Sequence, residues 1–154
     1  MITFFDTELK LMEEDLSKLE ERISFELHKD YRKHLLNYNG GRCEPNVFSF
    51  IENGKETESN IDWFLAVYDG EHDNFEEYFN IYKIQNKRMP SEIFPIGHDP
   101  GGNLICMNRI NGKVYFWNHE EEVNYNVLGD EVQSNLYLIA ESLEDFILTL
   151  KSWD

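Results

Sequence analysis

The sequence predicts an α+β fold in which a single, mostly antiparallel sheet is flanked by helices. Apolar residues recur at helical spacing near both ends of the chain, which predicts two N-terminal helices and a C-terminal helix. Between them lie short β-branched and aromatic runs separated by Gly, Asn and Pro, which are typical of strands joined by turns. We expect residues 1–154 to form one domain, because this length is near the commonest domain size.

The first predicted helix covers about residues 8–23. Its apolar residues lie three and four positions apart and therefore share one face: Leu9, Met12, Leu16, Leu19 and Ile23. A second helix is expected at about 29–38, ending before Gly40-Gly41, because glycine favours the end of a helix. The buried face of that second helix should carry Tyr31, Leu35 and Tyr38.

Two strands and two more helices are predicted further along the chain. Residues 46–51 (NVFSFI) and 61–68 (IDWFLAVY) are predicted as strands around a polar, glycine-containing turn. A helix over 75–86 would bury aromatic residues at helical spacing, namely Phe75, Tyr78, Phe79 and Tyr82. The C-terminal helix has an apolar face made of Leu143, Phe146, Ile147 and Leu150. Ser142 and Asp145 have the spacing of a capping box at its start.

Two turn signals occur between residues 95 and 119. Asp99-Pro100-Gly101-Gly102 predicts a type II turn, with positive φ at Gly101. As a phosphate loop this stretch lacks the GxGxxG spacing and a Walker lysine. Asn111-Gly112 is the preferred pair for a two-residue type I′ hairpin, with both residues at positive φ. The expected pairs are Arg109–Val114, Met107–Phe116, Ile105–Asn118, Asn108–Tyr115 and Cys106–Trp117. Because both faces of this hairpin are apolar, we expect it in the middle of the sheet, covered on both sides.

The formal net charge of −16 is concentrated in two segments. Residues 52–77 contain nine acidic side chains and one basic side chain, Lys55, and residues 114–150 contain eight acidic side chains without any lysine or arginine. Such charge disfavours direct binding to nucleic-acid phosphates or to anionic lipid. It would attract and steer a basic protein partner. The alternative is that the charge only keeps the protein in solution.

The composition indicates a cytoplasmic protein that does not enter a membrane. No apolar run approaches the ~20 residues that a membrane span needs. The first six residues, MITFFD, lack the basic and long apolar regions of a signal peptide. Cys43 and Cys106 do not form a metal-ligand pattern, and we expect two reduced thiols, with a disulfide between them as the alternative.

The sequence predicts no catalytic residues, no metal and no cofactor. The five histidines are His28, His34, His72, His98 and His119, and none of them forms an HExxH or HxH motif. His72 and Glu76 could share a helix face, but two ligands do not make a metal site. An acid–base role for His119 with the three glutamates after it is the alternative, although acids after a strand are usually a solvated loop. We therefore expect a protein without hydrolase or nuclease activity that folds without a metal.

Three stretches together resemble the SUKH superfamily, which includes Smi/Knr-type cell-wall regulators of fungi and many bacterial immunity proteins. They are LEERISFELHKDYRKHLLNYNGG (19–41), IFPIGHDPGGNLICMNRINGKVYFWNHE (93–120) and SLEDFILTL (142–150), within a similarity that spans roughly residues 8–151. One departure is Leu27-His28, where the family usually has Leu-Pro before the acidic residue and tyrosine that are here Asp30 and Tyr31. Loss of that proline is expected to loosen the start of the helix.

The resemblance implies an α+β domain that acts as an intracellular immunity protein. Such proteins bind and neutralise toxin domains, many of which are nucleases. Because a nuclease needs a basic surface to hold phosphates, an acidic protein can occupy that surface in place of nucleic acid. The expected partner is therefore a basic protein toxin domain. The alternative is a regulatory scaffold, a protein-interaction module of the Smi/Knr type.

The acidic segments contain aromatic residues, and aromatic anchors within a charged rim are typical of protein interfaces. The candidate contacts in the first segment are Trp63, Tyr68, Asp69, Glu71, Asp73, Glu76 and Glu77, and those in the second are Glu120, Glu121 and Glu122. Tyr125 and Tyr137 are further aromatic residues of the second segment. We favour residues 69–77, because they adjoin Trp63 and Tyr68 and because Glu76 and Glu77 should point away from the core.

Overall fold

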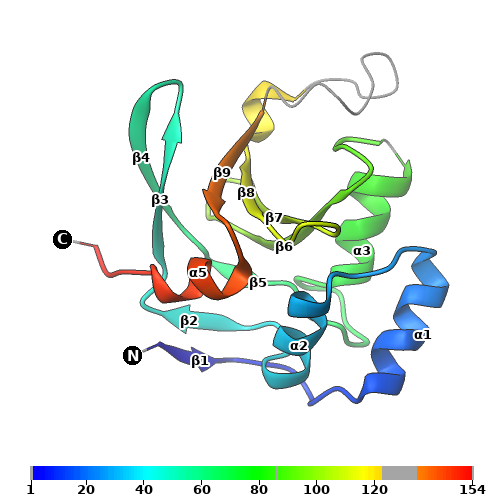
Figure 1. Cartoon of the computed structure of the whole chain (residues 1–154). Coiled ribbons are helices and arrows are strands. Elements are labelled where there is room, and N and C mark those ends of the chain that lie inside the picture. The colour runs from blue at the N-terminus through cyan, green and yellow to red at the C-terminus, as the bar shows by residue number, and fades with distance from the viewer. Residues whose placement is uncertain (1, 86, 123–134, 154) are drawn as a thin grey trace.

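The computed structural model describes residues 2–85, 87–122 and 135–153 and is built around a five-stranded sheet (Figure 1). Its strand order is β5-β6-β7-β8-β9, and every neighbouring pair is antiparallel. The strands are β5 (Trp63–Phe64), β6 (Ile93–His98), β7 (Leu104–Asn108), β8 (Val114–Trp117) and β9 (Leu136–Ala140).

Four further strands form two small antiparallel ladders. β1 (Thr3–Phe5) pairs with β2 (Arg42–Glu44), and β3 (Val47–Glu52) pairs with β4 (Lys55–Asn60). The prediction of an α+β fold with mostly antiparallel strands is confirmed. Within the described residues the strands are divided among three sheets, however, and do not form the single sheet that we predicted.

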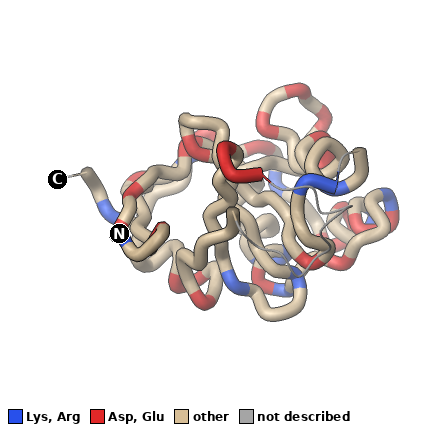
Figure 2. The backbone as a smooth tube through the Cα atoms, turned by 90° about the horizontal axis from the view of Figure 1, so that it is seen from above, with Lys and Arg blue, Asp and Glu red and all other residues tan. Residues whose placement is uncertain are grey.

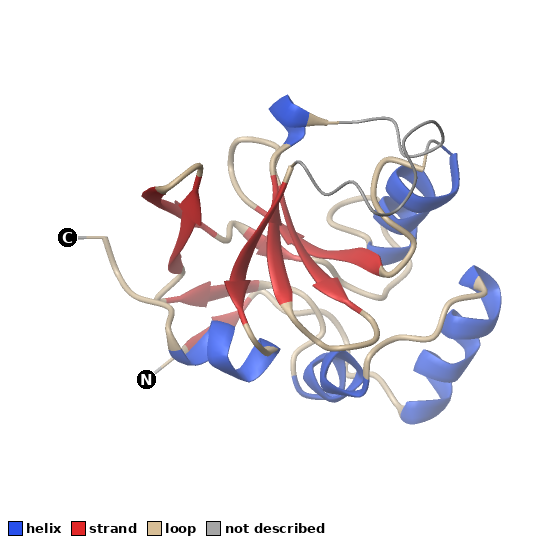
Figure 3. Ribbon diagram, turned by 45° about the horizontal axis from the view of Figure 1, so that its top comes forward, coloured by secondary structure: helices blue, strands red, loops and turns tan. Residues whose placement is uncertain are grey.

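Helices flank the sheet on several sides (Figure 3). The α-helices are α1 (Glu13–Ile23), α2 (Lys29–Asn37), α3 (Phe75–Phe79) and α5 (Leu143–Leu148). α3 continues into the π-helical turn η1 (Asn80–Gln85), and the 3-10 turn η2 (His119–Glu121) follows β8. The two N-terminal helices and the C-terminal helix are therefore confirmed, and residue 86, the predicted end of the third helix, lies outside the described residues.

The first helix begins five residues later than predicted. The side chain of Asp15 accepts a hydrogen bond from the Met12 amide at 2.8 Å and so stabilises a start at Glu13. Leu9 and Met12, which were predicted to lie on the buried face, are 87% and 67% exposed. Leu11 is buried instead, in the segment that precedes the helix.

The second helix has a defined start despite the missing proline. His28 is its N-cap, and its Nδ1 accepts a hydrogen bond from the Asp30 amide at 3.0 Å. The Glu20 carboxylate of α1 accepts a hydrogen bond from the Leu27 amide at 2.7 Å and also pairs with Arg32 of α2. The expectation of a loosened helix start was wrong, because hydrogen bonds of the His28 and Glu20 side chains stabilise this start in place of a proline.

The strand that pairs with β3 is not the one that we predicted. Asn53 and Gly54 have φ values of 52° and 83°, as a type I′ turn requires, and they join β3 to the polar strand Lys55–Asn60. The predicted apolar strand 61–68 contributes only β5 and an isolated bridge at Ala66. Turn chemistry therefore determines this pairing more than hydrophobicity does.

The second Asn-Gly pair does not form a type I′ turn. Only Gly112 of this pair has positive φ, at 76°, because the Asn108 side chain accepts hydrogen bonds from the amides of Ile110 and Asn111 and closes a longer loop. The observed pairs are Leu104–Trp117, Ile105–Phe116, Cys106–Tyr115 and Met107–Val114, two positions away from the predicted register. A shift of two leaves every side chain on its predicted face.

The turn at Asp99 also differs from the prediction. Gly102, and not Gly101, has positive φ, at 87°. The Asp99 carboxylate accepts hydrogen bonds from the amides of Gly101 and Asn103 at 2.8 and 2.9 Å, so a side chain organises this turn in place of the type II geometry.

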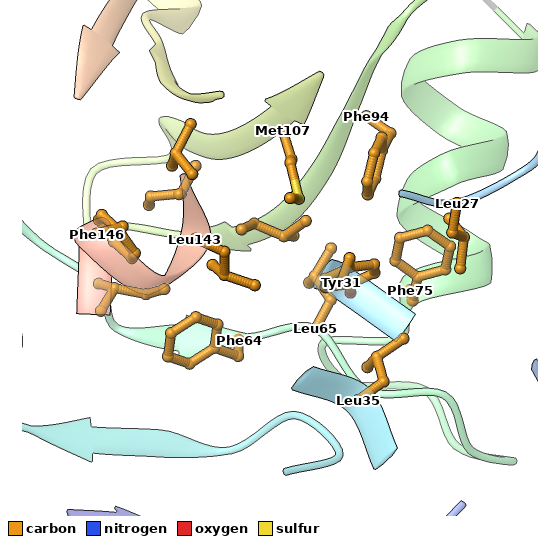
Figure 4. Packing of buried hydrophobic residues seen from close by; sticks show 14 of the residues in the cluster. Leu27, Tyr31, Leu35, Phe64, Leu65, Phe75, Phe94, Met107, Leu143 and Phe146 are labelled. Atoms are coloured by element: carbon orange, nitrogen blue, oxygen red, sulfur yellow. The ribbon is translucent and has the colours of Figure 1, made fainter. Parts of the chain in front are cut away.

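Both faces of the five-stranded sheet are covered by buried side chains, which confirms the mid-sheet position of the β7–β8 hairpin. The larger core contains residues from Leu11 to Leu150, and Figure 4 shows Phe64, Tyr31, Phe94 and Met107 packed within it. The smaller core on the other face contains Met89, Ile93, Leu104, Cys106, Trp117 and Leu136. α5 adds Leu143 and Phe146 to the larger core, and Ser142 caps it by accepting from the Asp145 amide at 3.0 Å.

Candidate protein-binding cleft

Asn39 joins the N-terminal segment to the chain that follows β5. This side chain is 3% exposed, and its Nδ2 donates hydrogen bonds to the carbonyl oxygens of Leu9 and Val67, both at 2.9 Å. Its Oδ1 accepts a hydrogen bond from the Val67 amide at 2.8 Å. Three bonds from one buried amide therefore hold two segments that lie almost sixty residues apart in the sequence.

Gly40 and Gly41 allow the same two segments to approach closely. Their φ values are 71° and 90°, in the left-handed region that glycine tolerates. A Cβ atom on Gly40 would lie 2.5 Å from the Cβ of Ala66, and one on Gly41 would lie 2.5 Å from the carbonyl oxygen of Phe5. The Gly40-Gly41 pair, which we interpreted as a helix stop, therefore also builds a junction together with Asn39.

A cleft of about 420 Å³ lies at this junction. The buried residues Gly41, Phe64 and Ala66 form its floor, and the more exposed lining residues form its walls: Asp6, Glu8, Trp63, Tyr68, His72 and Asp73. Among the described residues, no lysine or arginine lines it. We call this hollow the N-terminal cleft. It combines an aromatic and apolar interior with three carboxylates.

Side-chain hydrogen bonds fix the loop that forms one wall of the N-terminal cleft. The Tyr68 hydroxyl accepts from the His72 amide at 3.1 Å and donates to the carbonyl oxygen of the same residue. Asn74 donates to the carbonyl oxygens of Tyr68 and Gly70 at 2.9 and 2.8 Å and caps α3 by accepting from the Glu77 amide. These hydrogen bonds tie the loop to itself and to the start of α3.

Asp73 is anchored to the sheet by His98. Its Oδ1 lies 2.6 Å from His98 Nε2, while His98 Nδ1 lies 3.0 Å from the carbonyl oxygen of Asp99. Each ring nitrogen of His98 therefore has an oxygen within hydrogen-bond distance, one on the loop and one on the backbone. Tyr78 stacks on the imidazole with ring centroids 6.0 Å apart. Burial, and then the nearby charge of Asp73, raises the pKa of Tyr78 to about 12, so this hydroxyl stays protonated.

A second hollow of about 340 Å³ lies on the α1 side of the same loop. Tyr68 borders both hollows, and Asp69 and Glu76 line only the second. Glu76 accepts from the guanidinium of Arg22 on α1 at 3.0–3.3 Å. Glu76 points away from the core as expected, but this ion pair occupies it, so it is not freely available to a partner.

The first set of predicted contacts is thus only partly brought together. Trp63, Tyr68 and Asp73 meet at the N-terminal cleft. Asp69, Glu71 and Glu77 are exposed beside it, on the loop and on the first turn of α3.

The second set of predicted contacts lies elsewhere, at η2, and lines neither hollow. Glu120 is exposed, Glu121 accepts from the Tyr137 hydroxyl at 2.7 Å, and Glu122 forms two 2.8 Å hydrogen bonds with Arg88. Tyr125 lies outside the described residues. Figure 2 shows acidic positions on several separate loops and helices, with basic positions between them.

The two buried thiols and two of the histidines have structural surroundings. Burial raises the pKa of the Cys43 thiol to about 12 and that of Cys106 further still, so neither is a thiolate at neutral pH. His28 caps α2, and His98 bridges Asp73 to the backbone. In the part of the chain that the structure describes, no group of three or more His, Cys, Asp or Glu side chains is placed to hold a metal ion.

Sequence reasoning missed Asp6, Glu8 and the triplet 39–41 as parts of this site. The available signal was the Asn39-Gly40-Gly41 triplet itself, since two successive glycines can mark a close backbone approach as well as a helix end.

No described helix has the length and apolar character that crossing a membrane requires.

The helix pair ending in the Asn-Gly-Gly triplet, the mid-sheet hairpin and the final helix are the features on which the SUKH resemblance is based. A sequence model of the SMI1 / KNR4 family (SUKH-1) matches residues 10–149, and the chain belongs to this family. It is also similar to the SPbeta prophage-derived uncharacterized protein YokK of Bacillus subtilis (strain 168). The two are 28% identical over 153 residues, which cover 89% of this chain and 73% of the relative.

Proposed function

We propose that this protein is an intracellular immunity protein that binds and neutralises a basic toxin domain, with a nuclease as the favoured class. Membership in the SMI1 / KNR4 family (SUKH-1) is consistent with such a role. The observation that carries the proposal is the N-terminal cleft, where Asp6, Glu8 and Asp73 surround Trp63 and Tyr68. Aromatic side chains beside carboxylates are suited to bind basic protein surfaces.

The charge of the whole chain supports the same partner. A net charge of −16 raises the encounter rate with a basic protein and opposes binding to nucleic acid itself. A nuclease presents Lys and Arg side chains where it holds phosphates. Occupying those side chains with carboxylates would block substrate binding without any chemistry by the immunity protein.

The structural roles of the reactive side chains favour binding over catalysis. Both thiols are buried and protonated, and two of the histidines cap a helix or bridge the loop to the sheet. His34 is buried among aromatic rings, 5.2 Å from Phe64 and 5.6 Å from Phe4 between ring centroids. These groups contribute to the fold and are not presented to a substrate.

Coexpression with toxin domains encoded in the same genome tests the proposal. We expect one basic toxin domain to stop bacterial growth alone and to permit growth when this chain is coexpressed. The purified chain should bind a catalytically inactivated form of that domain by isothermal titration calorimetry and inhibit the active form. If it relieves the toxicity of none of them, neutralisation is contradicted. A complex in which the toxin stays fully active would instead favour a regulatory scaffold of the Smi/Knr type.

A further inference from the structure

We propose that the N-terminal cleft is a receptor for one arginine side chain of the partner. The inference rests on the proposed function, because it names the group through which a basic partner would engage this surface. It is drawn from four features of the cleft: its free carboxylates, its tryptophan, its apolar floor and its rigid wall.

Two carboxylates of the cleft are available to a cation. Asp6 and Glu8 are exposed, and neither forms an ion pair with any described residue. Asp73 contributes a third carboxylate, in which Oδ1 is bonded to His98 and Oδ2 forms no hydrogen bond with a described residue. Carboxylates at the rim of a low-dielectric hollow attract a cation more strongly than carboxylates on an open surface.

Trp63 already binds one guanidinium within the protein. The Cζ atom of Arg42 lies 5.2 Å from the Trp63 ring centroid. Arg42 also forms an ion pair with Asp62, in which Nη2 lies 3.3 Å from Oδ1. Arg42 does not line the cleft, whereas Trp63 does and is only half-buried. The same ring therefore has surface left for a second planar cation, a contact that tryptophan favours over other aromatic side chains.

The size and floor of the cleft suit a long side chain with an apolar stem. Hollows of about 300–1,000 Å³ hold small organic ligands, and this one is about 420 Å³. Gly41, Phe64 and Ala66 give its floor an apolar surface against which methylene groups can pack. Arginine fits better than lysine, because a planar fork can bond a carboxylate through two nitrogens while it stacks on an indole.

Hydrogen bonds within the chain hold both walls of the cleft. The hydrogen bonds of Tyr68 with His72 and of Asn74 with Tyr68 hold one wall. The hydrogen bonds of Asn39 with Leu9 and Val67 hold the N-terminal segment, which forms the other wall. A site that needs no ordering on binding loses less free energy to conformational entropy. Even an isolated arginine derivative should therefore bind measurably.

A titration with two matched small molecules tests this inference. The ¹⁵N-labelled chain is titrated with N-acetyl-L-arginine amide and, separately, with N-acetyl-L-citrulline amide, which has the same length and a planar head without the charge. The indole signal of Trp63, assigned with a Trp63→Phe variant, should shift and saturate in the millimolar range with the arginine derivative. The citrulline derivative should bind at least five-fold more weakly.

Two charge-matched double variants locate the site. Asp6→Asn with Glu8→Gln should weaken binding of the arginine derivative at least five-fold. Asparagine is also suited to the left-handed backbone at residue 6, where φ is 55°. Asp69→Asn with Glu71→Gln removes the same charge from the loop outside the cleft and should change the affinity less than two-fold.

Three outcomes would overturn the inference: an unshifted Trp63 indole, equal binding of the citrulline derivative, or equal weakening by both double variants. The dispersion of the amide spectrum checks that each variant is folded. No toxin is present in this assay, so its failure leaves neutralisation to be decided by the coexpression experiment. Conversely, a negative coexpression result would not alter the affinity measured for the arginine derivative.

Discussion

The amide side chain of Asn39 pairs with the backbone of Val67 as one peptide group pairs with another. Oδ1 accepts from the Val67 amide at 2.8 Å, and Nδ2 donates to the Val67 carbonyl oxygen at 2.9 Å. The same Nδ2 also reaches the carbonyl oxygen of Leu9. Because a buried carbonyl without a donor is costly, this side chain determines how the two walls of the N-terminal cleft meet.

Replacing Asn39 by aspartate should destabilise the protein by about 2–4 kcal/mol. The change removes the donor and places a carboxylate against the carbonyl oxygens of Leu9 and Val67. Urea unfolding followed by circular dichroism measures the loss. Asn37→Asp, at an exposed position two residues earlier, is the control and should cost well under 1 kcal/mol. Similar losses in the two variants would show that the Asn39 contacts do not matter.

Gly112→Ala should destabilise the fold by more than Gly54→Ala does. Both glycines have positive φ, 76° and 83°, so each alanine costs about 1 kcal/mol in backbone strain. At Gly54 the new methyl group meets nothing within 4 Å, whereas at Gly112 it lies 2.8 Å from His28 Nε2. Because His28 caps α2, moving it should add about 0.5–2 kcal/mol.

Thermal or urea unfolding of the two glycine variants gives this difference directly. Gly112→Val should be worse than alanine, because a β-branched side chain fits left-handed backbone poorly. Equal stability of Gly112→Ala and Gly54→Ala would contradict the contact with His28.

The two Asn-Gly pairs show why the secondary structure was predictable only in part. Helical spacing identified Leu16, Leu19 and Ile23 correctly, because a periodic pattern over several turns leaves few alternatives. A turn signal is shorter, and its outcome depends on neighbours. Asn53-Gly54 forms the type I′ turn, but at Asn111-Gly112 the Asn108 side chain captures two amides and closes a longer loop.

The candidate site was predictable from local patterns only where its residues are close in sequence. Trp63, Tyr68 and Asp73 lie within eleven positions, and their acidic and aromatic composition indicated an interface. Asp6 and Glu8 reach the same cleft through a long-range approach that depends on Asn39. Nothing in the spacing of those acids indicates which distant segment they will meet.

His34 should make the protein less stable as the pH falls from 6.5 toward 4. This side chain is 8% exposed, and burial lowers its pKa from 6.5 to about 4. Between these values the unfolded chain binds a proton that the folded chain does not, so the free energy of unfolding decreases as the pH decreases. Above pH 6.5 His34 is neutral in both states, and this penalty is absent.

The variant His34→Leu measures that contribution. From the two pKa values, about 2 kcal/mol of the stability lost between pH 7 and pH 5 should disappear in the variant. Urea unfolding at both pH values provides the comparison, and His72→Gln, at an exposed position, should keep the wild-type profile. A His34→Leu profile parallel to that of the wild type would show that His34 titrates normally in the folded protein.

The two acidic clusters should differ in how strongly they steer a basic partner. Asp69 and Glu71 are exposed and adjoin the N-terminal cleft, whereas Glu120 and Glu121 lie at η2, away from it. The paired residues Glu76 and Glu122 are left intact, because Arg22 and Arg88 hold them. Exposed charges contribute little to stability, and the side-chain carbonyl oxygen of glutamine at position 121 can still accept the hydrogen bond from Tyr137, so neutralising either set should leave the fold unchanged.

Asp69→Asn with Glu71→Gln should slow association with the toxin domain identified by coexpression more than Glu120→Gln with Glu121→Gln does. Both variants change the net charge by the same amount, so a larger effect of the first locates the encounter surface near the cleft. At ~0.02 M salt we expect the first variant to associate roughly three- to ten-fold more slowly than the wild type. At ~0.5 M salt this decrease should be smaller, because ions then screen charges that lie more than a few ångströms apart. Stopped-flow kinetics across this salt range provides the measurement. An association rate that is indifferent to salt and to both pairs of substitutions would rule out charge steering, while the family assignment and the cleft would remain.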